Sequence, residues 1–183
     1  MRIATLLVTC VLCSSIVFAD DESTINADAT FDFSKVTTFA IRPGRISSQK
    51  PELNNRLFLQ KVDAAIRAAV VAKGLKEVAD RPDVVVGFSV TSQDYSVTGG
   101  QRGTRIPDGP RGSGIRGAVI PGTGPIPELF TEGTLVIDVT VAQTGALVWR
   151  GTYRDEERSG PRLARSLPED ATQLLSKYPS RKR

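Results

Sequence analysis

The sequence contains no histidine and only two cysteines, Cys10 and Cys13, both inside its first apolar segment. Without histidine the chain cannot form a Ser-His-Asp triad, a Cys-His dyad or an imidazole metal site. Beyond Cys13 it also lacks any thiolate nucleophile, disulfide or cysteine ligand for zinc. The residues therefore predict no catalytic residue, no metal site and no bound cofactor.

The charge balance is modest and the apolar content is ordinary. The 183 residues carry 24 basic and 20 acidic side chains, a net charge of +4, and 40% of them are hydrophobic. This content allows a packed core, and the length is that of one domain. Composition alone does not define a biochemical activity.

The first nineteen residues have the pattern of a secretory signal peptide. Arg2 is followed by an uncharged run over 3–18, the segment ends Val17-Phe18-Ala19, and acidic residues follow at once. A basic start, a short apolar run and a small residue at the cut define such a leader. We expect cleavage after Ala19 and export to the periplasm or the exterior. The mature chain would then have no cysteine and no transmembrane segment.

The alternative for this segment is a lipid anchor at Cys13. A lipoprotein leader is cut directly before the modified cysteine and carries a small residue at that position. Here the bulky Leu12 precedes Cys13, so lipid attachment to a membrane is the less favoured reading.

Residues 20–34 hold five acids and no base and are interpreted as a polar lead-in to one α+β domain over 35–179. A strand is expected over 36–41 and a branched, apolar strand over 84–91. Between them, an apolar stripe at three- and four-residue steps predicts a helix, capped by Asn55 and ended by Gly74.

Residues 95–130 differ sharply from the rest of the chain. They contain nine of the sixteen glycines and five of the eleven prolines. Such a composition buries too little apolar area to offset the entropy lost on ordering, so we interpret the segment as a loop between two strands. The pattern Gly112-x-Gly114-x-x-Gly117 occurs here without the strand and helix that a dinucleotide site needs.

The next two strands, over 134–141 and 147–153, are predicted to form a hairpin whose turn uses Gly145 at positive φ. Asp138 and Arg150 then face each other on one side of the hairpin as a structural ion pair. The other side is apolar and pairs Val141 with Leu147, Val139 with Trp149, Ile137 with Gly151 and Leu135 with Tyr153.

A final helix is expected to begin at Ser166, because Ser166-Leu167-Pro168-Glu169 fits a capping box. Residues 180–183 form a basic tail. The element order β-α-β, loop, β-β-α predicts a two-layer α+β fold. Its mostly antiparallel sheet of four to five strands would have the helices on one face.

Four stretches together resemble a bacterial envelope family known as domain of unknown function 4136. They are 32–35 with 38–40, 81–86, 132–138 and 145–151, and the resemblance spans about residues 28–179. Members of that family look like lipoproteins or periplasmic proteins. The resemblance implies export and an α+β fold, and it implies no established activity.

Four arginines punctuate the glycine-rich segment, and they are the candidate contacts to an anionic partner: Arg102, Arg105, Arg111 and Arg116. Arginine-glycine segments also bind RNA, but an exported chain with few aromatic residues here does not favour nucleic acid. Anionic lipid, a glycan or another envelope protein suits these charges better.

The acidic run Asp155-Glu156-Glu157 supports an alternative function, a carboxylate-based hydrolase of cell-wall or glycan material. Consecutive strand residues point to opposite faces, however, so these carboxylates are not expected to converge. The sequence therefore favours a non-enzymatic binding or accessory module of the envelope.

Overall fold

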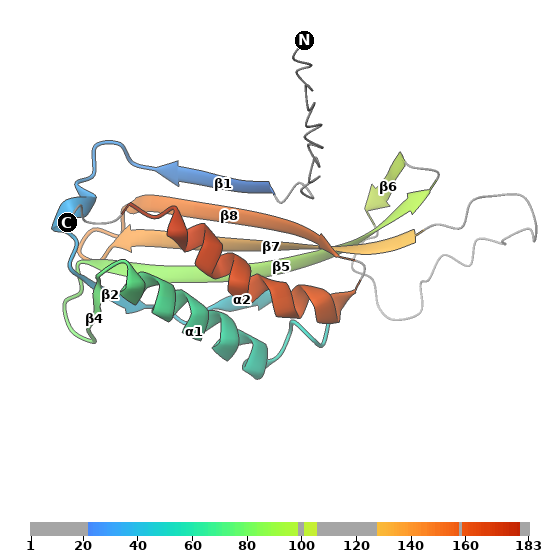
Figure 1. Cartoon of the computed structure of the whole chain (residues 1–183), viewed down its shortest axis with the longest axis horizontal. Helices are drawn as coiled ribbons and strands as arrows, with labels where there is room; N and C mark the ends of the chain where they lie inside the picture. Colours follow the sequence, from blue (N-terminus) through green and yellow to red (C-terminus); the bar gives the residue numbers. More distant parts are fainter. Residues whose placement is uncertain (1–21, 99–100, 106–127, 158, 180–183) are drawn as a thin grey trace, which may run out of the picture.

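A computed structural model describes residues 22–98, 101–105, 128–157 and 159–179. The predicted leader, both cysteines and the basic tail lie outside these residues. The described part forms two layers, an eight-stranded mixed sheet and two helices packed against one face of it (Figure 1).

The strand order across the sheet is β1-β8-β7-β5-β2-β4, and β3 and β6 also pair with β5. The bounds are β1 Glu22–Ala27, β2 Thr38–Ile41, β3 Arg45–Ser47, β4 Lys76–Glu77, β5 Val84–Thr98, β6 Gln101–Arg105, β7 Glu128–Val141 and β8 Leu147–Glu157. The strands β1, β8, β7 and β5 are antiparallel neighbours, whereas β2 and β3 run parallel to β5.

The predicted α+β class is correct, but the expected four to five mostly antiparallel strands were too few. The strand predicted over 36–41 corresponds to β2, whereas β3 was not predicted. Both strands run parallel to β5, and this makes the sheet mixed. The cause is the helix between β2 and β5, because a crossover connection of this kind returns the chain in the parallel direction.

The interpretation of residues 20–34 as a lead-in outside the domain was wrong. Residues 22–27 form β1, which pairs antiparallel with β8 from Glu22↔Arg154 to Ala27↔Trp149. A 3-10 turn follows over Phe33–Lys35, capped by the Asp32 carboxylate. The composition of this segment did not predict a strand, because an edge strand with one solvent-facing side needs few apolar residues.

Helix α1 spans Arg56–Ala72 and matches the sequence prediction at both ends. The Asn55 side chain accepts a hydrogen bond from Phe58 N at 2.8 Å, which satisfies one of the free amides of the first turn. Gly74 adopts φ 89°, the left-handed conformation that ends many helices. The buried stripe is Phe58, Val62, Ile66, Ala69 and Val70.

Helix α2 spans Gly160–Ser176, so its predicted start at Ser166 was wrong by six residues. Ser159 is the N-cap residue, and a proline occupies the first turn, where its missing N–H costs nothing. Ser166 lies inside the helix and donates a hydrogen bond to the Asp155 carboxylate at 2.8 Å. Pro168 is therefore an interior proline.

The β7–β8 hairpin has the predicted register over most of its length. Val139 lies opposite Trp149, Ile137 opposite Gly151 and Leu135 opposite Tyr153, and Gly145 adopts φ 72° in the turn. The expected pairing of Val141 with Leu147 was wrong. A bulge after Val139 shifts the register, so Leu147 lies opposite Thr140.

The core lies between the helices and the sheet and is centred on Trp149, which is fully buried, as the sequence predicted. Its ring contacts Tyr178 edge to face, with 5.6 Å between centroids. Helix α2 approaches closely here because Gly151 has no side chain. A Cβ on Gly151 would lie only 2.5 Å from Trp149 Cη2 and 2.8 Å from Leu174 Cγ.

Candidate functional site

The face of the sheet turned away from the helices is polar. Along β5 and β7, buried residues alternate with more exposed ones. The buried side chains face the helices and include Val84, Val86, Leu135 and Ile137. Their neighbours in the sequence point to the opposite face because strand side chains alternate. We call this second face the open face.

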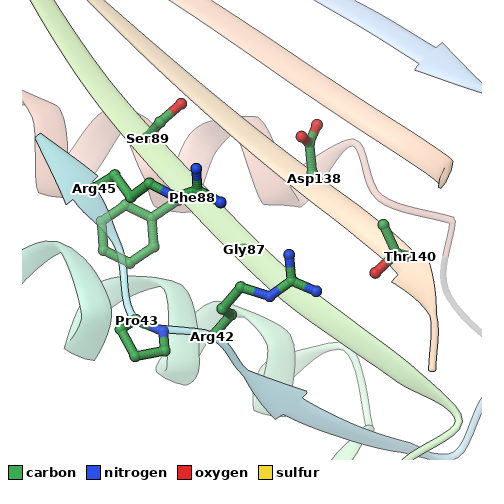
Figure 2. Close-up of a pocket in the computed structure, with 8 residues that line it drawn as sticks. All are labelled: Arg42, Pro43, Arg45, Gly87, Phe88, Ser89, Asp138 and Thr140. Carbon is green, nitrogen blue, oxygen red and sulfur yellow. The ribbon is translucent and has the colours of Figure 1, made fainter. Parts of the chain in front are cut away.

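A pocket of about 220 Å³ lies on the open face, where β2 and β3 meet β5 and β7 (Figure 2). Arg42 follows the end of β2 and Arg45 begins β3, so both approach from one side of β5. Asp138 and Thr140 on β7 form the other side. Gly87 and Ser89 of β5 lie between them.

Strand register explains why these residues meet. Gly87 lies opposite Asp138, and Arg45 lies opposite Ser89 in the parallel β3–β5 pair. Arg42 N donates to Val86 O at 2.8 Å, which holds its backbone beside β5. Figure 2 shows both guanidinium groups extending over β5 toward β7.

The guanidinium groups of Arg42 and Arg45 are exposed and carry no carboxylate partner within the described residues. Arginine presents five N–H donors in a planar fork, which suits carboxylate and phosphate oxygens. The pocket therefore has two cationic groups available for a ligand.

Asp138 is held by Arg150 of β8 in a two-pronged contact. Arg150 Nε donates to Asp138 Oδ1 at 2.6 Å, and its Nη2 donates to Oδ2 at 2.8 Å. These bonds raise the pKa of the Arg150 guanidinium above its ordinary value. The Arg150 side chain is 45% exposed, so the pair fixes the orientation of Asp138 more than it stabilises the fold.

The four arginines predicted to contact an anionic partner are not brought into this pocket by any described contact. The backbone of Arg105 lies opposite Tyr95, and that of Arg102 lies opposite Val97, in the β5–β6 pair. Arg111 and Arg116, like the Gly112-x-Gly114-x-x-Gly117 pattern, lie outside the described residues. Their role in binding stays a prediction.

In the acidic run at the end of β8, the two side chains that the structure describes, Asp155 and Glu156, do not form a carboxylate pair. Asp155 faces the helices and accepts from Ser166, whereas Glu156 faces the open side and accepts from Tyr95 Oη at 2.5 Å. The side chain of Glu157 is not described. Because Asp155 and Glu156 lie on opposite faces of the sheet, these two carboxylates do not form the pair that the hydrolase alternative requires.

Within 22–98, 101–105, 128–157 and 159–179, no three acidic, histidine or cysteine side chains cluster as ligands for a metal ion. In the same part of the chain, neither helix has the length and apolarity needed to cross a membrane.

Sequence reasoning missed Arg42, Arg45 and Gly87 as site residues. The strand predicted over 36–41 ended before Arg42, and no strand was predicted at the position of β3, so neither arginine was expected to lie beside β5. The one usable signal was the alternation of Val84–Val90, in which Gly87 and Ser89 occupy the positions that face away from the core.

The chain thus presents a two-layer α+β domain with one polar, cation-bearing sheet face. It belongs to the family described as domain of unknown function (DUF4136), which matches residues 23–180. The resemblance inferred from four sequence stretches is therefore confirmed, and the match begins within β1. No curated protein matches the chain.

Two solved structures are similar in fold. A DUF4136 family protein from Bacteroides thetaiotaomicron is 15% identical, with a TM-score of 0.54, covering 90% of this chain and all of the other. A PDZ domain protein from Parabacteroides distasonis is 13% identical, also with a TM-score of 0.54, over 88% of this chain. This chain spans only 36% of that protein. At such identities the likeness is one of fold alone.

Proposed function

We propose that the protein is an exported, non-enzymatic binding module of the bacterial envelope, and that the open face is its binding surface. The observation that carries the proposal is the asymmetry of the sheet. Both described helices cover one face, and the other holds a pocket with two exposed guanidinium groups (Figures 1 and 2). Export is supported by the leader-like pattern over 1–19.

Site-specific photo-crosslinking in cells of the producing bacterium tests the binding surface. The photoreactive residue is placed at Thr152, which shares the open face on β8, and in a matched variant at Gln60, exposed on α1. We expect adducts with another envelope component from position 152 and few from position 60. Equal yields from both positions, or adducts from position 60 alone, would contradict the proposal.

Amino-terminal sequencing of the protein purified from the envelope fraction tests export. We expect the chain to begin at Asp20. Recovery of the protein with Met1 intact, in the cytosolic fraction, would exclude an exported module. A chain that begins at a lipid-modified Cys13 would replace the free exported form with a membrane-anchored one.

A further inference from the structure

The pocket on the open face has a size, a charge and a set of hydrogen-bonding groups that together define a ligand. We propose that it binds one acidic sugar unit, with Arg42 and Arg45 holding the carboxylate and with Asp138, Ser89 and Thr140 contacting the hydroxyls. This inference rests on the proposed function and names the chemical class that the open face recognises.

The size of the pocket limits the ligand to a single small unit. Its volume of about 220 Å³ lies below the roughly 300–1,000 Å³ of pockets that enclose drug-sized molecules. A nucleotide or a lipid chain would extend well beyond it. One pyranose ring, as a residue of a longer glycan or as a free sugar, suits the space and the position on an open surface.

The two arginines supply the recognition of an anion. Neither guanidinium is neutralised by a carboxylate in the described part of the chain. Hydrogen bonds between arginine and a carboxylate are charge-assisted and stronger than those between neutral groups. The carboxylate of a uronic acid type of sugar would satisfy these donors.

Asp138 distinguishes an acidic sugar from a bare anion. Its carboxylate forms part of the pocket wall, and a carboxylate only accepts hydrogen bonds, so it would repel inorganic phosphate. Arg150 orients both of its oxygens and leaves lone pairs that can accept from sugar hydroxyls. A ligand that carries both a negative group and hydroxyl donors satisfies both sides of the pocket.

Two hydroxyl groups and a glycine complete the site. Thr140 Oγ1 donates to Val85 O at 3.3 Å, so its oxygen lone pairs are directed to accept from a ligand. Gly87 leaves space at the centre of the pocket. A Cβ added there would lie 4.0 Å from the nearest atom, Arg42 Cβ, so the fold tolerates a side chain that would take up ligand space.

Titration of the full ¹⁵N-labelled chain with D-glucuronate tests the inference, with D-glucose and inorganic phosphate as comparison probes. We expect the amide signals of Gly87 and Ser89 to shift with glucuronate, with a dissociation constant of the order of 1 mM for so small a ligand. Glucose and phosphate should each bind about tenfold more weakly or worse. Equal binding of glucose, or tighter binding of phosphate, would overturn the acidic-sugar assignment.

Three variants and one control locate the site. Arg42→Gln and Arg45→Gln should each weaken glucuronate binding by about tenfold or more, because each loses a charge-assisted contact. Gly87→Ala should weaken it by about threefold or more while the protein stays folded. Arg56→Gln removes an exposed arginine on the helix layer and should leave binding unchanged. Binding that survives all three pocket variants would overturn the inference.

The two proposals fail in different ways. If glucuronate does not bind but position 152 still forms adducts in cells, the sugar assignment is wrong and the binding module stands. If position 152 also forms no adducts, the open face is not a binding surface and the proposed function falls with it.

Discussion

Asp83 shows how one side chain joins two segments that are distant in the sequence. Its Oδ2 accepts hydrogen bonds from Thr37 N, Thr37 Oγ1 and Thr38 N, each at 2.9 Å. The Asp83 amide in turn donates to Thr38 Oγ1 at 3.0 Å. These bonds hold the start of β2 beside the start of β5.

The same bonds lower the pKa of Asp83 from 3.8 to about 2, chiefly through the Thr37 amide. Because the pKa is lower in the folded state than in the unfolded state, the bonds stabilise the fold at pH values above about 4. That contribution decreases as the pH falls from about 4 to about 2, because the carboxylate becomes protonated.

We therefore expect Asp83→Asn to unfold at lower urea concentration than wild type at pH 6, and the gap between them to narrow toward pH 2.5. Urea unfolding at both pH values measures this. Asp80→Asn, a change at a nearby exposed carboxylate, is the control and should show no such convergence. A gap of constant size across the range would contradict the assigned bonds.

The roles of single residues could be predicted from the sequence where they depend only on residues nearby in the chain. Asn55 and Gly145 act within a few residues of their own positions, so the sequence pattern alone identified them. The pocket residues are different. Arg45 faces Ser89 only because β3 pairs with β5, and this pairing joins segments more than forty residues apart.

At the scale of elements, α2 shows tertiary packing overriding a local signal. The capping-box letters at Ser166 are genuine, yet the helix begins six residues earlier. Leu163, which lies before the predicted start, is fully buried against the sheet. A Cβ on Gly133 would overlap the Leu163 side chain, so the fit depends on glycine in β7. Burial of that leucine extends the helix toward the N-terminus.

Because α2 extends toward its N-terminus, Pro168 lies inside the helix and destabilises it. A proline inside a helix removes one backbone hydrogen bond and clashes with the carbonyl four residues earlier, here that of Ala164. We expect Pro168→Ala to raise the free energy of unfolding by about 1–3 kcal/mol, measured by urea denaturation. Pro161→Ala, in the first turn, is the control and should change stability much less. Loss of stability in Pro168→Ala would show that the proline is not strained.

The strands β5 and β7 also extend farther than composition indicated. Sequence reasoning ended the ordered strands before Tyr95 and resumed them after Phe130. In the structure these two residues lie opposite each other, and their rings stack with 5.7 Å between centroids. The pairing continues to Val97↔Glu128. A cross-strand aromatic contact thus stabilises strand ends whose neighbours in the sequence are glycine- and proline-rich.

At the scale of the whole molecule, one sheet face forms the core and the other, the open face, is the surface that we propose for binding. The amphipathic patterns of the helices and the hairpin predicted that one face of the sheet is buried, because the apolar side chains of each element lie on one side of it. They did not predict the width of the sheet. The strands that widen it are short or polar, and they are stabilised by pairing with neighbours distant in the sequence.

Strand β1 is one of the strands that widen the sheet, and its contribution to stability can be measured directly. It covers the outer edge of β8 along six paired residues, and Ile25 packs against the core. Lys177 Nζ donates to Ser23 Oγ at 2.5 Å, which links the end of α2 to the same strand. Residues 22–27 are therefore part of the domain, although they precede the predicted boundary at residue 35.

A chain that starts at residue 28 should consequently be less stable than one that starts at residue 20. We expect the free energy of unfolding to fall by about 1–3 kcal/mol, the scale of burying one isoleucine side chain. The uncovered edge of β8 should also promote self-association, which size-exclusion chromatography at increasing concentration would detect. Equal stability and a monomer in both chains would show that β1 is dispensable and that the domain begins after it.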